Sequence, residues 1–575
     1  MLFPTRPDTI MKTSLPCLLQ TARPLLIPAL VMLVWHPFAV HGQNVPDAGQ
    51  ILRELRQPPS PGVLPQPEAK PVENVPEMPV DDVRITITAF AISGNTAISN
   101  EDLQDPLTEL LGQRLGLGEL RSAAARLTAL YRERGYPVAR AYLPAQDIRG
   151  GKVSIVILEG NIGKVLLRNA SSLSDERALA FFKDAAAGAV IRSDQVDRGL
   201  LLLNDVPGVG AVRATLQPGA TVGSSDMVLE LDQGQRYAGN LALDNHGNRY
   251  TGHARISGSF VMNNLSGMGD QLSILGLLSN EKLGYGRLAY SIPVGSNGMR
   301  AALALSSTRY ELAREFAVLD AHGRANSMSL TLAYPFIRRQ RATLGGSLSV
   351  ETKRLTDRIG ATETVNEKRA HVLNLGLAAN FQDALGGGAA TSAELSGSFG
   401  RLKIDSPTAL GIDDLTVRTN GSYRKLYFAG NRLQRLTDQD QLWMAVSAQW
   451  AQKNLDSSEK FLLGGAGGVR AYPQGEGIGD DGYLATVELR HNFGTALQGT
   501  VFYDAGSVKV NHTVYDTAAA NKRTLAGAGL GFNAVLAGTD LRASLAWRTV
   551  GGDPISVPAG TSKSPTLWVR ANRPF

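Results

Sequence analysis

Residues 236–575 show a repeating alternation of apolar and polar positions. Within residues 539–548, for example, one set of alternate positions is apolar: Leu541, Ala543, Leu545 and Trp547. A period of two predicts strands with one apolar face, and the clusters of Gly, Asn, Asp and Ser between such segments predict turns. At roughly 20 residues per strand and connection, the region holds about 16 strands, an even number as in bacterial transmembrane barrels. A sandwich would alternate in the same way but would be unusually large, so the pattern favours an antiparallel transmembrane β-barrel.

Residues 81–160 instead combine short strand patterns with two helix patterns. The first strand pattern begins at Ile85, and Ser99 is a candidate N-cap for the first helix. A second helix is expected to end at Gly135, which is a suitable C-cap residue, and two further strands follow it. The expected order is therefore β-α-α-β-β.

The same order of elements recurs over residues 161–235. Helices are expected over residues 174–184 and 193–203, with one strand before them and two after them. The two segments therefore predict tandem copies of one small α/β module.

The N-terminal part of the chain divides into three sections. Residues 1–42 place an apolar stretch after Lys12 and end in small residues, which is typical of a secretory signal peptide. Residues 43–57 predict a short amphipathic helix, and residues 58–80 are so rich in proline that they predict an extended linker. The apolar positions of the predicted helix are Ile51, Leu52 and Leu55.

Composition narrows the ways in which this chain can cross a membrane. After residue 42 there is no run of about 20 apolar residues, so a transmembrane helix is not predicted. A chain that spans a membrane without such a helix must do so as a closed barrel. The 61 glycines and the low charged fraction of 19% suit a barrel of many strands and turns.

Several other kinds of chemistry have no support in the sequence. Cys17 is the only cysteine, and the eight histidines lack the spacing of metal ligands, so no metal or other cofactor is expected. The glycine-rich residues 464–468 lack the Lys-Ser/Thr pair of a phosphate loop, which argues against a nucleotide site. The net charge of +6 is spread without basic–aromatic clusters, so nucleic-acid binding is not expected. Because no nucleophile–base set can be found either, the chain is predicted not to be an enzyme.

Segments of both the modules and the barrel resemble transporters of two-partner secretion. Residues 135–147 and 203–209 resemble the polypeptide-transport-associated (POTRA) domains of that family, and residues 463–472 resemble its Val-Arg-Gly-Tyr loop motif. Residues 502–506 are similar to its Phe-x-Asp-x-Gly strand motif. The resemblance covers nearly everything after residue 47. It implies an outer-membrane barrel with periplasmic POTRA domains at 81–160 and 161–235, which exports an unfolded partner protein to the cell surface.

The resemblance also implies a site inside the barrel. The loop motif consists of Val469, Arg470, Ala471 and Tyr472, and the strand motif that it meets includes Phe502, Asp504 and Gly506. The alternation independently places Asp504 on the polar, lumenal face of its strand, with Glu488 and Arg490 on the same face of the preceding strand. By the resemblance, the loop that carries Arg470 folds into the barrel and its guanidinium meets Asp504. A guanidinium can bind a carboxylate through two bonds, so this contact would fix the loop.

One residue departs from the family pattern. Ala471 occupies the position where the family usually has glycine. Because alanine restricts positive φ, the tip of the loop is expected to be held slightly differently.

The resemblance implies two further roles and a set of partners. The helix with Ile51, Leu52 and Leu55 would plug the barrel lumen, and Phe575 would be the terminal aromatic residue read by the barrel-assembly machinery. The expected partners are a secreted protein of the haemagglutinin, haemolysin or adhesin type, outer-membrane lipid and that machinery.

Two alternatives to the transporter reading remain at the level of the sequence. A barrel-assembly factor has a related architecture and would insert other barrels into the membrane. A passive diffusion porin would leave the paired modules unexplained. Two modules, a plug helix and a proline-rich linker together favour the secretion transporter.

Overall fold

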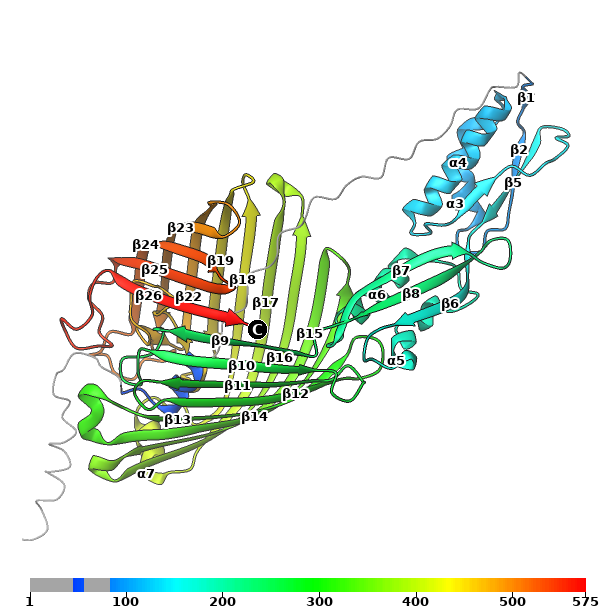
Figure 1. The fold of residues 1–575 in the computed structure, drawn as a ribbon. Coiled ribbons are helices and arrows are strands. Elements are labelled where there is room, and N and C mark those ends of the chain that lie inside the picture. The colour runs from blue at the N-terminus through cyan, green and yellow to red at the C-terminus, as the bar shows by residue number, and fades with distance from the viewer. Residues whose placement is uncertain (1–44, 56–82) are drawn as a thin grey trace, which may run out of the picture. The chain divides into compact units, whose positions relative to one another are not determined.

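Sequential antiparallel hairpins close the alternating part of the chain into a barrel of sixteen strands (Figure 1). In this computed structural model, residues 45–55 and 83–575 are described. The predicted signal peptide, the whole of the predicted linker, and residues 43–44 and 56–57 of the predicted helix segment lie outside the described residues. The antiparallel barrel predicted from the alternation is confirmed. Its strands, in order, are β9 (Tyr237–Asp244), β10 (Arg255–Asn263), β11 (Gln271–Ser279), β12 (Gly284–Pro293), β13 (Arg300–Glu311), β14 (Ala321–Arg338), β15 (Ala342–Ile359), β16 (Thr364–Asp383), β17 (Ala389–Ile404), β18 (Gly421–Arg435), β19 (Asp440–Ala451), β22 (Asp481–Asn492), β23 (Leu497–Lys509), β24 (Lys522–Leu536), β25 (Thr539–Val550) and β26 (Thr566–Pro574).

The barrel closes where the last strand meets the first. β26 pairs with β9 from Arg570↔Asp244 to Pro574↔Asn240. Beyond this register, the backbone N–H and C=O of Phe575 each bond to Gly239 at 2.9 Å. Closure leaves no strand edge within the sheet, which is the condition for a sheet to span a bilayer.

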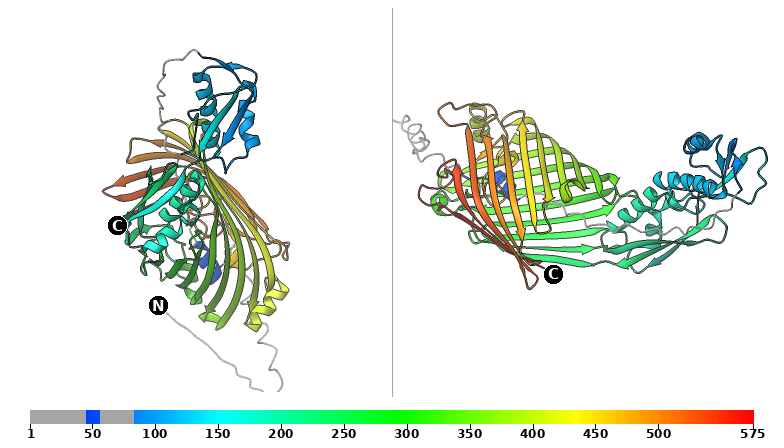
Figure 2. Two further views of the ribbon diagram at one scale, coloured as in Figure 1. Left: turned by 90° about the vertical axis from the view of Figure 1, so that its right-hand side faces the viewer. Right: turned by 90° about the horizontal axis from the view of Figure 1, so that it is seen from above.

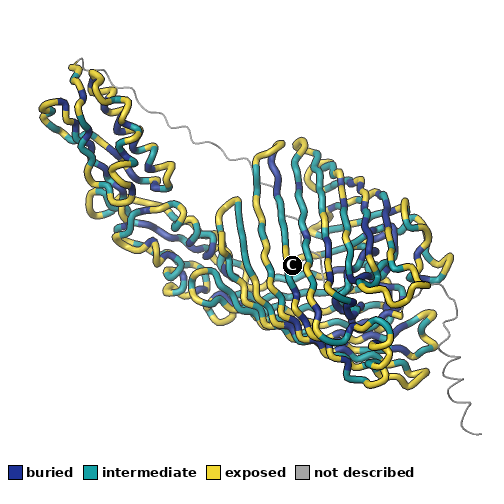
Figure 3. The backbone as a smooth tube through the Cα atoms, turned by 180° about the vertical axis from the view of Figure 1, so that it is seen from behind, coloured by how far each residue is buried: buried dark blue, intermediate teal, exposed yellow. Residues whose placement is uncertain are grey.

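Residue parity separates the two faces of the wall. On β23, Val501 and Tyr503 are 58% and 46% exposed, whereas Thr500 and Asp504 are 8% and 1% exposed. Exposed and less exposed residues alternate in the same way along much of β13 and β16, and Figure 3 colours the backbone by burial. The apolar residues thus face the lipid and the polar ones face the lumen, as the alternation predicted.

Each of the two modules folds around its own core. The first contains β1 (Ile85–Thr86), β2 (Ala89–Ser93), α3 (Asn100–Gln104), η1 (Asp105–Leu110), β3 (Arg114–Leu115), α4 (Leu117–Glu133), β4 (Arg140–Tyr142) and β5 (Lys152–Leu158). The second contains β6 (Asn161–Asn169), α5 (Asp175–Ala180), η2 (Lys183–Ala185), α6 (Ser193–Asn204), β7 (Val209–Pro218) and β8 (Ser224–Gln233). Their three-stranded sheets have the orders β2-β5-β4 and β6-β8-β7, with the first pair parallel in each case.

The first module departs from the predicted β-α-α-β-β order at its beginning. The strand that starts at Ile85 is only two residues long and pairs with β3, and Ile87 continues this pairing through backbone hydrogen bonds with Gln113 and Gly112. A second strand, β2, then pairs with β5. The expected single strand is therefore two strands in two different sheets.

The helix α2 (Ala48–Glu54) lies inside the barrel (Figure 2). The carboxylate of Asp47 caps it by accepting from the backbone N–H of Gln50 at 2.9 Å. Ile51 and Leu52 are buried with Tyr250, Tyr310 and Leu355 of the barrel, and Leu55 packs at the edge of this cluster. The apolar side of the predicted helix therefore faces the barrel wall.

Short elements in the connections complete the structure. They are η3 (Arg314–Leu319), η4 (Gly360–Thr362), η5 (Leu385–Gly387), α7 (Pro407–Leu415), η6 (Ser457–Glu459), β20 (Phe461–Leu462) and β21 (Ile478–Gly479). Among the described residues, no helix combines the length and apolarity needed to cross a membrane.

A buried carboxylate holds the first module together. Glu159 accepts hydrogen bonds from the backbone N–H groups of Thr96 and Ala97 at 2.7 and 2.8 Å, from the Thr96 hydroxyl, and from the Tyr131 hydroxyl at 2.7 Å. Burial by itself raises the pKa of this carboxyl, but these hydrogen bonds outweigh burial and leave the pKa below its usual value. The ionised group thus links the loop before α3 to α4.

Glu159→Gln is expected to destabilise the first module by about 1–3 kcal/mol, because an amide cannot accept all of these bonds. Since the folded pKa is lowered, the contribution of the carboxylate is complete above the unfolded pKa of about 4.3 and is lost as the pH falls through the folded value. Amide hydrogen exchange of α4 and β5, followed in the full chain at neutral and acidic pH, measures both effects. The exposed Glu133→Gln in the same module is the control, and equal exchange in both variants would contradict the assignment.

Candidate functional site

The loop motif lies at the tip of the long connection between β19 and β22. We call this connection, residues 452–480, the lumenal loop. Its two arms pair as β20 and β21, and Val469 N–H bonds to the carbonyl of Leu463 at 2.8 Å. A Cβ at Gly468 would lie 2.0 Å from that carbonyl oxygen. The glycine-rich residues 464–468 therefore permit a tight fold that brings Arg470 to the wall.

Arg470 binds two carboxylates at once. Its Nε and Nη2 donate to the two oxygens of Asp504, each at 2.8 Å, and its Nη1 donates to Glu488 at 2.7 Å. The backbone N–H of Arg470 also donates to Asp504 at 3.1 Å. The guanidinium carbon lies 3.4 Å from the centre of the Phe502 ring, so the group is stacked as well as paired.

The carboxylates are themselves held in place by the wall. Asp504 on β23 accepts from the Thr486 hydroxyl at 3.0 Å, and Glu488 on β22 accepts from Nε of Arg490 at 2.8 Å. The side chains of Asp504 and Glu488 are only 1% and 8% exposed. Two arginines thus face two carboxylates, and the cluster carries no net charge. Parity had placed Glu488 on the correct face, but the sequence did not predict that it shares Arg470.

Glycine supplies the space that the loop needs against the wall. A Cβ at Gly506 would lie 2.4 Å from the carbonyl oxygen of Tyr483 on the neighbouring strand β22 and 2.5 Å from the Cδ1 of Leu463 in the lumenal loop. Gly506, the glycine of the strand motif, is therefore the position against which Leu463 of the lumenal loop packs. Phe502, from the same motif, forms the platform under Arg470.

The tip is also tied to the last strands of the barrel. Tyr472 is fully buried, and its hydroxyl lies 2.8 and 2.9 Å from the carbonyl oxygens of Val550 and Gly552. The Trp568 indole donates to the Arg470 carbonyl at 2.7 Å, and the Thr566 hydroxyl donates to the Ala471 carbonyl at 3.0 Å. Tyr472 thus lies beside Arg470 in sequence but makes its own contacts, which sequence reasoning did not identify.

Ala471 does not need the conformation that alanine disfavours. It is not among the non-glycine residues with positive φ, and its side chain is fully buried. A Cβ added at Gly527 on β24 would lie 2.4 Å from the Cβ of Ala471. The methyl group at this position is therefore accommodated by a glycine on the facing strand, next to a register shift between Ala526 and Gly527.

A sixteen-stranded barrel, two α/β modules, and a loop fixed in the lumen by an arginine define an outer-membrane protein-secretion channel. The chain belongs to the haemolysin secretion/activation family ShlB/FhaC/HecB, whose pattern matches residues 223–534. A POTRA domain of the ShlB type matches residues 85–160. The protein is thus a two-partner secretion transporter of the outer membrane with POTRA domains, and transporters of this family work with a secreted partner protein.

Known proteins share this organisation over most of their length. The heme/hemopexin transporter protein HuxB of Haemophilus influenzae strain 86-028NP is 28% identical over 509 residues, covering 85% of this chain and 89% of HuxB. The structure of CdiB from Escherichia coli superposes with a TM-score of 0.68 at 18% identity, covering 89% of this chain and 93% of CdiB. BamA from Haemophilus ducreyi without POTRA domains 1–3 gives a TM-score of 0.50 at 15% identity, covering 85% of this chain and all of that chain. The last two likenesses concern the fold alone, and family membership favours the transporter over the assembly factor.

Gly527→Ala is expected to weaken the packing of the loop tip against β24, because the new methyl group would overlap Ala471. Overpacking of this kind costs typically about 1–3 kcal/mol. The double variant Gly527→Ala/Ala471→Gly should recover part of the loss but not all, since the carbonyl of Trp547 lies 3.0 Å from the same Cβ position. Protease accessibility of the lumenal loop in membrane-inserted protein measures the effect.

Gly276→Ala is the matched control, because a Cβ there meets no other atom within 4 Å. If Gly527→Ala leaves the loop as protected as this control does, the two residues are not in the contact described.

Proposed function

We propose that this barrel exports an unfolded secreted protein of the haemagglutinin, haemolysin or adhesin type, and that the Arg470 cluster holds the lumenal loop in the position that transport requires. The observation that carries the proposal is the bidentate pairing of Arg470 with Asp504, reinforced by Glu488. Relatives named as a heme/hemopexin transporter and as the outer membrane transporter CdiB support a transport role for this barrel.

The ion pairs set how firmly the loop is held. Removing one partner of a buried pair typically costs about 3–5 kcal/mol, and the cost is lower where water reaches the charges. The Arg470 side chain is 16% exposed, so the loop is fixed firmly but is not sealed from the lumen. This arrangement suits an element that must hold one position at rest and shift when a polypeptide passes.

The remaining assigned residues fit the same proposal. The helix with Ile51, Leu52 and Leu55 obstructs the lumen in the resting channel. Phe575, which is 71% exposed beside the closing strand β9, serves as the signal for the barrel-assembly machinery. Lipid surrounds the apolar outer wall. In this proposal, transport proceeds without catalysis, nucleotide or cofactor.

Arg470→Ala and Asp504→Ala are each expected to leave the barrel inserted but to impair secretion. The double variant should be little worse than Arg470→Ala, because both changes remove the same interaction. Arg470→Lys should not restore secretion, since an ammonium cannot reproduce the two-bond geometry. The readouts are secreted partner in the medium and heat-modifiable barrel in the membrane.

Arg401→Ala, at an exposed position of β17, is the control for loss of an arginine from the barrel. Fully additive losses of secretion in the double variant would mean that Arg470 and Asp504 act separately, and the proposed role would then be withdrawn.

The modules are proposed to capture the client as an extended strand. Strands β7 and β6 are the edges of the second sheet, and β2 and β4 are the edges of the first. Several residues near the end of β7 are exposed, so a client segment can pair with its backbone. Such pairing depends on main-chain groups and tolerates many client sequences.

Purified residues 80–235 are expected to bind the unfolded N-terminal domain of the partner more tightly than the same domain when folded. Only an unfolded segment offers free backbone groups for strand addition. Titration calorimetry with both forms of the partner measures the difference. Equal affinity for the two forms would contradict capture by strand pairing.

A further inference from the structure

We call residues 454–460 and Asp480, where the lumenal loop leaves and rejoins the wall, the root of the loop. The root carries buried charges that take no part in the Arg470 cluster. Glu459, in η6, forms ion pairs with Lys353 of β15 and, at 2.7 Å, with Lys425 of β18. The side chains of these three residues are only 1–7% exposed. The Lys425 ammonium also donates to the Glu459 carbonyl at 2.9 Å, as does the Gln449 amide. The backbone and the side chain of Glu459 are thus both fastened to the wall.

A second lysine contact joins the loop to the plug helix. Lys368 of β16 lies 2.9 Å from Asp456 of the loop and 3.4 Å from Asp47, the N-cap of α2. The Ser457 hydroxyl donates to the same Asp47 carboxylate at 2.7 Å. One ammonium group therefore holds a carboxylate from each of two segments that lie far apart in the sequence.

The plug helix rests directly on this part of the loop. A Cβ at Gly49 would lie 2.3 Å from the Ser457 hydroxyl oxygen and 2.6 Å from the backbone nitrogen of Ser458. Further along the helix, Nε of Arg53 donates to the carbonyl of Lys460 at 3.2 Å. Helix α2 thus packs directly on the lumenal loop, and glycine at position 49 permits this close approach.

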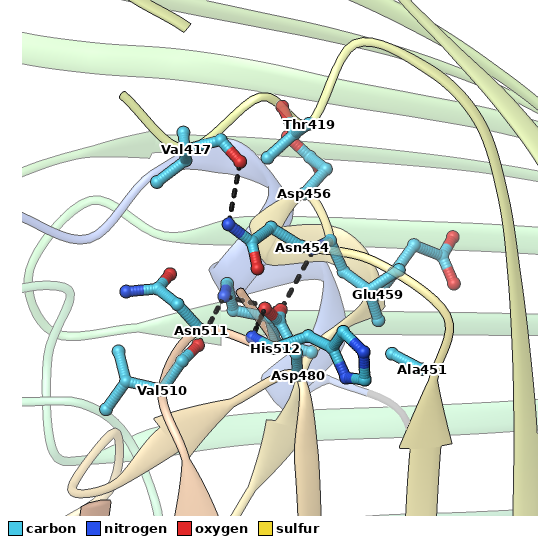
Figure 4. Close-up of polar contacts among 12 residues, drawn as sticks. Val417, Thr419, Ala451, Asn454, Asp456, Glu459, Asp480, Val510, Asn511 and His512 are labelled. Carbon is cyan, nitrogen blue, oxygen red and sulfur yellow. Dashed lines mark hydrogen bonds and ion pairs between the residues drawn. The ribbon is translucent and has the colours of Figure 1, made fainter. Parts of the chain in front are cut away.

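Neighbouring connections hold the root from the other side (Figure 4). The Asn454 amide donates to the carbonyl oxygens of Val417 and Thr513 at 2.8 and 2.9 Å. The Asp480 carboxylate accepts from Lys460 at 2.6 Å and from the backbone N–H of His512 at 2.8 Å. The root therefore joins the connections after β17 and β23 to the wall.

The two ends of the lumenal loop are fastened to different parts of the barrel. The tip contacts β22 to β26, whereas the root contacts β15, β16, β18 and β19. We propose that Glu459 and Asp456, with Lys353, Lys425 and Lys368, form a second anchor that positions the lumenal loop across the pore and seats the plug helix on it. These five residues are called the root anchor below.

The charges give the root anchor a consequence that can be measured without a client. Three lysines of the wall face the lumen, and the carboxylates of the loop lie among them. Removing a loop carboxylate leaves buried ammonium groups insufficiently paired, which draws water and anions into the lumen. The ionic selectivity of the pore therefore reports whether the loop carboxylates neutralise the lysines.

The proposal predicts opposite electrical effects for the two partners of one pair. In planar bilayers with a salt gradient, Glu459→Gln is expected to shift the reversal potential towards anion selectivity, and Lys425→Gln is expected to shift it towards cation selectivity. Glu459→Asp, which keeps the charge, should restore most of the wild-type selectivity. Glu459→Gln should also lower secretion while the barrel remains heat-modifiable.

The variant Gly49→Val tests the packing of the plug helix on the loop separately from the charge of the root anchor. The larger side chain would collide with Ser457 and Ser458, so the plug should dissociate and the channel should open more often. The reversal potential should shift less than in Glu459→Gln, because Lys353, Lys425 and Lys368 keep the loop carboxylates Glu459 and Asp456, and Lys368 loses only Asp47 of the plug. Glu363→Gln, at an exposed position between β15 and β16, is the matched control and should change neither quantity.

Wild-type selectivity in both Glu459→Gln and Lys425→Gln, or shifts of the same sign, would overturn the root anchor. Wild-type opening in Gly49→Val would overturn the seating of the plug on the loop. Because the electrical measurements use no client, their outcome is independent of the identity of the secreted partner and of the proposed role of Arg470.

Discussion

A sheet can span a bilayer only if every backbone N–H and C=O in the hydrocarbon finds a partner within the protein. Pairing of β26 with β9 meets this condition and turns a sheet into a closed wall. Closure also creates a lumen, which is lined by every second residue of each strand. The polar lumenal residues cannot face lipid, and an unfilled lumen would leave an open pore. These residues must therefore bind the segments that fill the lumen, and this requirement shapes the rest of the structure.

Buried ion pairs, as well as apolar packing, fix the segments that fill the lumen. Arg470 lies between Asp504 and Glu488, and Lys353 and Lys425 enclose Glu459. Paired charges of this kind are firm while they remain together, but water can solvate them once they separate. Two apolar surfaces that separate into water would have no such compensation. A loop held by ion pairs can therefore be rigid at rest and still be displaced by a passing chain.

Sequence reasoning worked where a short-range rule applied. The period of two predicted the barrel and placed Asp504 on the lumenal face, and helical spacing predicted the apolar side of α2. Sequence reasoning failed where the closure of the barrel determines which side chains come into contact. Lys353 and Glu459 are 106 residues apart, and no local pattern associates them. Gly527 is one of many glycines, and its relation to Ala471 appears only when β24 and the loop tip meet.

The substitution at Ala471 shows how such non-local constraints act. Taken alone, alanine at a position usually occupied by glycine suggests a changed backbone, because glycine commonly marks positive φ. The backbone here does not have positive φ, so the position is restricted by space instead. The required space is supplied by Gly527 on the facing strand. The tip can therefore carry a methyl group without moving Arg470, provided that the strand opposite it stays free of a side chain.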